Sequence, residues 1–285
     1  MIPGAFDYHA PASLEEALSL LSANVDDAKI LAGGQSLLPL MKLRLAKPEV
    51  IIDIGGLSEL NYIREDGDHI AIGALATYTD VAESELILSR CPLLAQTAVV
   101  VGDVQVRNRG TVGGGLAHAD PAEDLPAAIL ALDAELKAAG PDGERWIPAS
   151  DFFIMMLTTS LMPEELLTEI RVPARDGYKT SYQKVSRQAA GFAIVGVAVC
   201  LKESADGVCE DIAVAVTGMT DVAFRAEKVE AALRGQKLDD STITSAAALV
   251  TDGIDPIEDV NATPAYRAHL AQVYVERTIQ AARAG

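Results

Sequence analysis

The stretch TVGGGLAHADPAEDLP, residues 111–126, places three consecutive glycines ahead of a histidine and a run of carboxylates. A second glycine-rich turn, AGGQS, stands at residues 32–36. Neither turn has the G-x-G-x-x-G spacing of a Rossmann fold or the G-x-x-x-x-G-K-[ST] spacing of a P-loop. Glycine permits positive φ and has no Cβ, so such turns can direct backbone N–H groups toward an anion and let it approach closely.

The first glycine loop (residues 32–36) and the second glycine loop (residues 111–115) have two interpretations. They could clamp the pyrophosphate of one dinucleotide, with the hydroxyls of Ser36 and Thr111 as further donors. They could also be tight connections between strands, since glycine is common in turns of every kind.

The carboxylates after the second glycine loop have three interpretations: a metal site, a helix cap and contacts to a ligand. His118, Asp120, Glu123 and Asp124 offer one imidazole and three carboxylates, a superficial ligand set for a metal. Pro121 favours the alternative, a helix that starts at this proline with Asp120 as its cap. Glu123 and Asp124 would then lie in the first turn, where negative side chains suit the helix dipole. We expect capping here.

Composition argues against several classes of protein. Acidic residues number 41 against 23 basic residues, and the net charge of −18 disfavours binding to nucleic acid or to an anionic membrane surface. The N-terminus lacks the features of a signal peptide and no apolar run is long enough to span a bilayer, so we expect a cytoplasmic chain without a transmembrane segment. Cys91, Cys200 and Cys209 show no C-x-x-C spacing, which predicts free core thiols and no zinc or iron–sulfur site.

The first part of the chain shows an α/β pattern. Ser13 can cap a helix whose apolar residues recur at helical spacing, and VIIDIG at residues 50–55 has the continuous apolar character of a buried strand. Residues 84–101 have helical spacing until Gly102 interrupts it. Further strand-like segments are residues 28–31, 69–73, the two halves of 134–148 around a Pro-Asp-Gly turn, and 164–173.

After residue 176 the pattern changes to strands followed by helices. The strand-like segments are 181–188, 192–202 and 209–218, with a hairpin turn at Asp206-Gly207. The helical segments are 223–235, 241–253 and 263–284. We therefore expect a first domain at 1–176, with subdomains of about 1–55 and 56–176, and a second domain at 177–285.

Three segments resemble the FAD-binding medium subunit of the molybdenum hydroxylases. They are AGGQSLLPLMKLRLAKPEVIIDI at 32–54, QVRNRGTVGGGLAHADPAEDLPAAILAL at 105–132 and SYQKVSR at 181–187. The likeness is strongest to the medium subunit of aerobic carbon monoxide dehydrogenase, while xanthine, aldehyde and aromatic-substrate relatives carry similar modules. The resemblance implies an α+β fold: an FAD-binding domain of the vanillyl-alcohol-oxidase (PCMH) type with two α/β subdomains, then a three-stranded antiparallel sheet with a three-helix bundle.

The resemblance also implies which residues contact FAD. It assigns the pyrophosphate to Ala32, Gly33, Gly34, Gln35, Ser36, Thr111, Val112, Gly113, Gly114 and Gly115. Further flavin-contacting positions are Asp124 and Lys184, with Leu31, Leu37 and Leu167 as weaker matches. Two positions depart from the relatives, with Gln35 in place of His and Gly115 in place of Asn, so only backbone donation is expected there. Phe192 stands where some relatives place a tyrosine near the flavin ring.

The function that the resemblance implies is electron transfer, with no catalytic residue and no metal ligand in this chain. Electrons would pass from a molybdenum cofactor on a large subunit, through two-iron two-sulfur clusters on a small subunit, to FAD here and then to a quinone or other acceptor. The resemblance implies a dimer of heterotrimers that can associate with the inner face of the membrane. Two alternatives stay open: a self-sufficient FAD oxidase, and a scaffold that has lost FAD and serves only in assembly.

Overall fold

The computed structural model describes residues 2–285, and its N-terminal lobe is a small parallel sheet with helices between the strands. The strands β1 (Asp7–His9), β3 (Val50–Asp53) and β2 (Ala28–Leu31) lie in the order β1-β3-β2. The helices α1 (Leu14–Ala23) and α2 (Leu37–Lys42) connect the strands. Ser13 caps α1 as the sequence predicts, by accepting a hydrogen bond from the backbone N–H of Glu16.

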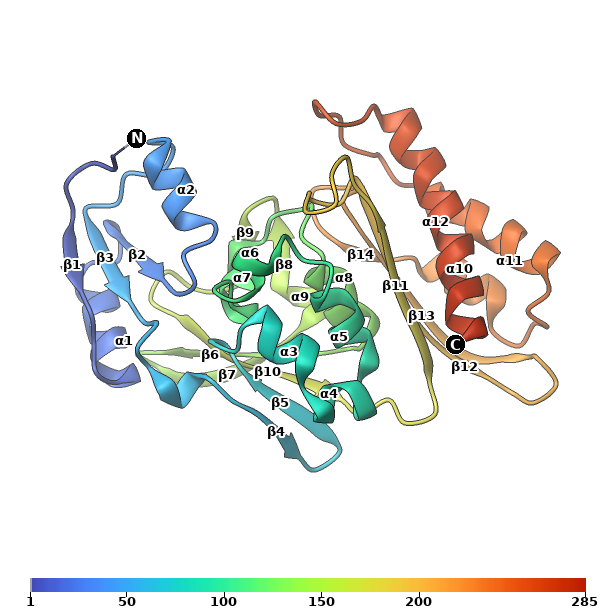
Figure 1. The fold of residues 1–285 in the computed structure, drawn as a ribbon, viewed down its shortest axis with the longest axis horizontal. Helices are drawn as coiled ribbons and strands as arrows, with labels where there is room; N and C mark the ends of the chain where they lie inside the picture. Colours follow the sequence, from blue (N-terminus) through green and yellow to red (C-terminus); the bar gives the residue numbers. More distant parts are fainter. Residues whose placement is uncertain (1) are drawn as a thin grey trace.

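The middle of the chain forms a five-stranded antiparallel sheet covered by short helices (Figure 1). In sheet order its strands are β4 (Ile63–Asp66), β5 (His69–Gly73), β10 (Leu166–Pro173), β6 (Glu135–Gly140) and β7 (Gly143–Pro148). The helices are η1 (Ser58–Leu60), α3 (Tyr78–Glu83), α4 (Glu85–Arg90), α5 (Pro92–Ala98), α6 (Val104–Arg107), α7 (Val112–His118), α8 (Leu125–Ala131) and α9 (Ala149–Phe152). A separate hairpin pairs β8 (Phe153–Met155) with β9 (Thr158–Thr159).

The helical segment expected at residues 84–101 is divided into α4 and α5. The break falls at Cys91, whose φ of −149° and ψ of 58° are not helical. Pro92 follows as the first residue of α5, and a proline disfavours the α region for the residue before it. Apolar spacing continues across the break, which is why periodicity alone predicts one helix.

The C-terminal part is an antiparallel sheet followed by helices. Its strands, in sheet order, are β11 (Lys179–Val185), β12 (Val195–Glu203), β13 (Cys209–Thr217) and β14 (Phe224–Arg225). The helices are α10 (Glu227–Leu233), α11 (Asp240–Ala247), η2 (Ala248–Thr251) and α12 (Pro264–Ala284). The three-stranded sheet expected from the resemblance is therefore wrong by one strand, because the two residues of β14 are too few to leave a pattern in the sequence.

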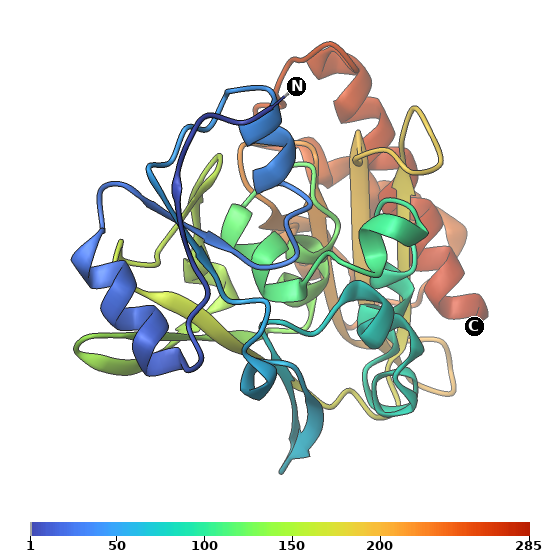
Figure 2. The same ribbon diagram turned by 60° about the vertical axis from the view of Figure 1, so that its left-hand side comes forward.

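The central strands of this sheet are buried on both faces, which explains their continuous apolar sequence. Along β12, Val197, Val199 and Leu201 pack in one core with residues of α12, while Ala198 and Cys200 pack in the other core with residues of α5 and α8. Figure 2 shows α12 along the outer side of these strands. Within residues 2–285, no helix is both long enough and apolar enough to cross a membrane.

The buried Arg267 joins α12 to the sheet. Its Nη1 atom donates to the backbone oxygens of Ile194 and Gly218, at 2.6 and 2.5 Å, and its Nη2 atom lies 2.6 Å from a carboxylate oxygen of Asp259. Only 2% of the residue is exposed. The guanidinium therefore satisfies carbonyl groups at the ends of β12 and β13 that water does not reach.

We predict that Arg267→Ala lowers the free energy of unfolding by about 3 kcal/mol, because two buried carbonyl oxygens lose their donor. Urea unfolding followed by circular dichroism measures the change. Arg277→Ala on the exposed part of α12 is the matched control and should cost far less. Equal losses in the two variants would contradict the structural role given to Arg267.

Candidate functional site

The two glycine loops lie against each other. The first glycine loop follows the carboxyl end of β2, and a Cβ on Gly33 would collide with the backbone carbonyl oxygen of Arg109. The methyl group of Ala32 lies 3.7 Å from the point where a Cβ on Gly114 would stand. Gly34 has a φ of +75°, which favours glycine. The chain thus brings together two segments that are far apart in the sequence.

The backbone N–H groups of the first glycine loop have no acceptor. Within residues 2–285, no backbone or side-chain oxygen accepts a hydrogen bond from the N–H of Gly33, Gly34, Gln35 or Ser36. The loop is partly exposed: Gln35 is exposed, and Gly33, Gly34 and Ser36 are half-buried. Successive unpaired N–H groups in a tight turn are a recognised anion site in proteins.

The N–H groups of residues 112–115 in the second glycine loop are already hydrogen-bonded to other groups of the protein. Val112 and Gly113 donate to the carbonyl oxygens of Ala76 and Ala74, both at 2.9 Å. Gly114 and Gly115 donate to the side chain and the carbonyl of Thr111, which caps α7. These bonds fix the loop, so it presents Gly114, which is exposed, as a surface without a side chain.

Asp124 and Lys184 form a buried ion pair between the middle and C-terminal parts of the chain. The Lys184 Nζ atom lies 2.9 Å from one carboxylate oxygen of Asp124, and the Tyr182 hydroxyl donates to the other at 2.6 Å. Burial raises the pKa of Asp124, while Lys184 and Tyr182 act in the opposite direction. Lys184 also donates to the carbonyl of Gly191, next to Phe192, a residue that is 66% exposed.

The remaining candidate residues are placed as follows. Leu31 ends β2 and Leu37 begins α2, so they flank the first glycine loop, whereas Leu167 is buried in β10. The side chain of Gln35 is exposed. The structure therefore brings the two glycine loops together and pairs Asp124 with Lys184, while Leu167 belongs to the core of the five-stranded sheet.

The helix expected to start at Pro121 begins later, at Leu125, with Pro126 in its first turn. Asp120 instead accepts a hydrogen bond from the N–H of Ala122, and Glu123 and Asp124 precede the helix as buried side chains. The capping interpretation is wrong because both carboxylates find partners in distant segments. In the described part of the chain, no three His, Cys, Asp or Glu side chains are arranged to hold a metal ion, and the three cysteines are buried free thiols.

Glu123 does not lie in the first turn of a helix, the position expected from its sequence. Its Oε1 atom accepts a hydrogen bond of 2.7 Å from the Tyr78 hydroxyl, and its backbone oxygen accepts from Thr217 at 2.7 Å. Burial raises the pKa of Glu123 to about 8, helped by the nearby Asp120 and Asp124 and opposed by the Tyr78 hydrogen bond. No local pattern marks this residue, because Tyr78 lies 45 positions away.

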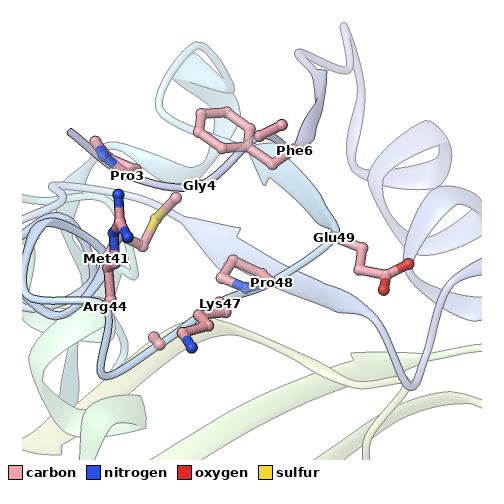
Figure 3. A pocket seen from close by; sticks show the side chains of 10 residues that line it. Pro3, Gly4, Phe6, Met41, Arg44, Lys47, Pro48 and Glu49 are labelled. Carbon is pink, nitrogen blue, oxygen red and sulfur yellow. The ribbon is translucent and has the colours of Figure 1, made fainter.

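A cavity of about 430 Å³ lies elsewhere in the N-terminal lobe. Figure 3 shows that it is lined by the N-terminal segment around Phe6, the end of α2 at Met41, and the loop that carries Arg44, Lys47 and Glu49. None of the residues expected to contact a cofactor lines it. The unpaired N–H groups of the first glycine loop therefore lie outside this cavity.

We predict that Glu123→Gln stabilises the protein at alkaline pH. The folded state raises the pKa of Glu123 from 4.5 to about 8, so its neutral form favours folding, and this stability is lost as the pH rises from about 4.5 through 8. Thermal unfolding at pH 9 should show a midpoint about 4 °C or more higher in the variant, and the difference should disappear near pH 4.5.

The control for this measurement is Glu83→Gln, which changes an exposed carboxylate on α3. Its unfolding midpoint should follow that of the unmodified protein at every pH. A pH-independent difference between Glu123→Gln and the unmodified protein would show that Glu123 does not titrate as described.

Two known protein families match the two parts of the chain. Residues 4–175 match the FAD binding domain in molybdopterin dehydrogenase, and residues 180–282 match the CO dehydrogenase flavoprotein C-terminal domain. Both parts of the α+β architecture expected from the sequence are thereby confirmed, apart from the extra strand β14.

Individual relatives extend over nearly the whole chain. The chain is 41% identical to the medium chain of glyceraldehyde dehydrogenase from Sulfolobus acidocaldarius, over 96% of each protein. It is also 41% identical to the medium chain of carbon monoxide dehydrogenase from Hydrogenophaga pseudoflava, over 99% of this chain and 98% of the relative. A solved carbon monoxide dehydrogenase from H. pseudoflava, which lacks the Mo-pyranopterin moiety of its cofactor, superimposes with a TM-score of 0.97 at 42% identity, covering 100% of this chain and 99% of that one.

Proposed function

The chain belongs to the FAD-binding medium subunits of the molybdenum hydroxylases, and on this premise we propose that its two glycine loops hold FAD for electron transfer within a carbon monoxide dehydrogenase. The observation that carries the proposal is the set of four N–H groups at residues 33–36 that lack an acceptor beside a glycine surface on α7. A chain with a net charge of −18 needs such local donors to bind a pyrophosphate.

The donor set fits FAD. The N–H groups of residues 33–36, with the hydroxyl of Ser36, would hold the pyrophosphate, and Ala32 would border it. Thr111, Val112, Gly113, Gly114 and Gly115 would form the opposite wall. This wall contributes close approach rather than donors, since the N–H groups of residues 112–115 are already bonded.

We assign the flavin end to the buried pair of Asp124 and Lys184 and to Phe192. Lys184 holds the carboxylate of Asp124 and the carbonyl of Gly191, and so fixes the loop that carries the exposed Phe192. Leu31 and Leu37, which flank the first glycine loop, would make apolar contacts to the cofactor, and Leu167 would support the site from the core of the five-stranded sheet. When bound, FAD accepts one or two electrons and so links single-electron iron–sulfur clusters to a two-electron acceptor.

The same proposal includes partners. The relatives are medium subunits of multisubunit enzymes, and we propose that this chain assembles with an iron–sulfur small subunit and a molybdenum large subunit, as a dimer of heterotrimers. Electrons would leave FAD for a quinone or another acceptor, with the complex at the inner face of the membrane. Glyceraldehyde dehydrogenase is a second candidate because its medium chain is as similar as that of carbon monoxide dehydrogenase, at 41% identity.

The proposal is tested by assembly. The purified chain should bind FAD and show a flavin absorption spectrum, yet CO should reduce a dye only after the large and small subunits are added. Reduction by glyceraldehyde but not CO in the full complex would favour the second candidate. Rapid reduction of the flavin in the isolated chain by a small alcohol or amine would instead indicate a self-sufficient oxidase, and failure to bind FAD would refute the proposal.

We predict that Gly33→Ala weakens FAD binding at least about tenfold, because the new Cβ meets the Arg109 carbonyl and pushes the two loops apart, and a loss of 1.4 kcal/mol is already tenfold. Quenching of flavin fluorescence measures the dissociation constant. Gly56→Ala is the matched control, since nothing lies within 4 Å of its Cβ and its φ is not positive. Equal affinities of the two variants would contradict the contact as a requirement of the site.

A further inference from the structure

A carboxyl group occupies the space directly behind the second glycine loop. A Cβ on Gly115 would collide with the Oε1 atom of Glu123 and with the hydroxyl of Tyr78. Position 115 therefore accepts no side chain as long as this pair is in place. The hydrogen bond of 2.7 Å from Tyr78 to Glu123 joins α3 to the segment before α8, across the back of the loop.

Among residues 2–285, no cationic side chain pairs with Glu123 to balance a negative charge. Its Oε2 atom is buried without a hydrogen-bond partner among the described residues, and only 7% of the residue is exposed. The titratable groups that face it are Tyr78 from α3, Asp120 and Asp124 from its own segment, and Tyr182 from β11. Lys184, the nearby cation, is already bound to Asp124 and Gly191. The surroundings of Glu123 therefore favour an uncharged carboxylic acid.

We propose that Glu123, as a neutral carboxylic acid held by Tyr78, positions the second glycine loop for FAD, and that ionisation of Glu123 weakens FAD binding. This inference rests on the proposed function, because it requires FAD at the glycine loops. Glu123 is buried and does not touch the cofactor; it acts through Gly115 and is a positioning residue.

The physical reason is a coupling between two negative charges. FAD brings an anionic pyrophosphate to the front of the loop, and an ionised Glu123 would place a second negative charge behind it, where water does not screen the repulsion. By linkage, bound FAD raises the pKa of Glu123 further, and FAD binding takes up a proton. Before FAD binds, burial, opposed by the Tyr78 hydrogen bond and helped by Asp120 and Asp124, raises the pKa of Glu123 to about 8, so the effect falls at mildly alkaline pH.

The test is the pH dependence of FAD affinity in the full chain freed of flavin. Flavin fluorescence quenching should show the dissociation constant rising about fivefold between pH 6.5 and 9, which is at the low end of known couplings between sites. Glu123→Gln keeps the shape of the side chain and cannot ionise, so its dissociation constant should not change between pH 6.5 and 9. The control Glu83→Gln should behave like the unmodified chain.

Two further measurements separate titration from simple packing. Calorimetry of FAD binding at pH 8.5 in two buffers of different ionisation enthalpy should show proton uptake by the unmodified chain and none by Glu123→Gln. In Tyr78→Phe, the loss of the hydrogen bond that favours the Glu123 anion should move the transition to higher pH. This second variant keeps the inference testable if Glu123→Gln does not fold.

The outcomes are distinct. A dissociation constant that does not change with pH in the unmodified chain overturns the inference but leaves the proposed function intact. The same slope in Glu123→Gln and the unmodified chain also overturns the inference, because another group would then be titrating. Absence of FAD binding at every pH overturns the proposed function and the inference with it.

Discussion

The backbone of Gly33 lies directly against the carbonyl oxygen of Arg109, and the geometry of the site depends on this contact. It fixes the N-terminal lobe, where the first glycine loop ends β2, against the segment that leads into α7. Any side chain at position 33 would separate the two segments. The absence of one Cβ thus sets the distance between a row of unpaired N–H groups and a bare glycine surface.

The two glycine loops are similar in sequence but differ in how their backbone N–H groups are hydrogen-bonded. The first keeps its N–H groups available to a ligand, while the second uses its own to bond to Ala74, Ala76 and Thr111. A loop that satisfies its own backbone is rigid before any ligand arrives, and such preorganisation reduces the ordering that binding requires. Behind it, the pair of Tyr78 and Glu123 fills the volume where a side chain at Gly115 would otherwise stand.

Much of the fold is predictable from sequence because buried strands have continuous apolar runs and tight turns have glycine. Residues 50–53, 166–173 and 195–203 form strands where these patterns predict them. The sequence does not reveal β14, which is two residues long, or the break at Pro92, where apolar spacing continues. Pairing of a strand as short as β14 depends on the neighbouring strand β13, and a two-residue segment has no sequence pattern of its own that predicts it.

The two glycine loops of the site can be predicted from the sequence, whereas the roles of the acidic residues Glu123 and Asp124 are harder to predict. The glycine loops can be recognised from their composition. The resemblance to a flavoprotein family adds Asp124 and Lys184 to the site, and the structure places Lys184 Nζ 2.9 Å from a carboxylate oxygen of Asp124. The environment of Glu123 comes from Tyr78, 45 residues earlier, and its charge state depends on burial that no short pattern records. Local rules of helix capping therefore gave the wrong role for this residue.

A crystal structure of the full chain with FAD would show where the pyrophosphate binds. We expect pyrophosphate oxygens within hydrogen-bond distance of the N–H groups of residues 33–36, with the second glycine loop in contact on the other side. Pyrophosphate density away from the first glycine loop, for example in the cavity beside Arg44 and Lys47, would contradict this expectation.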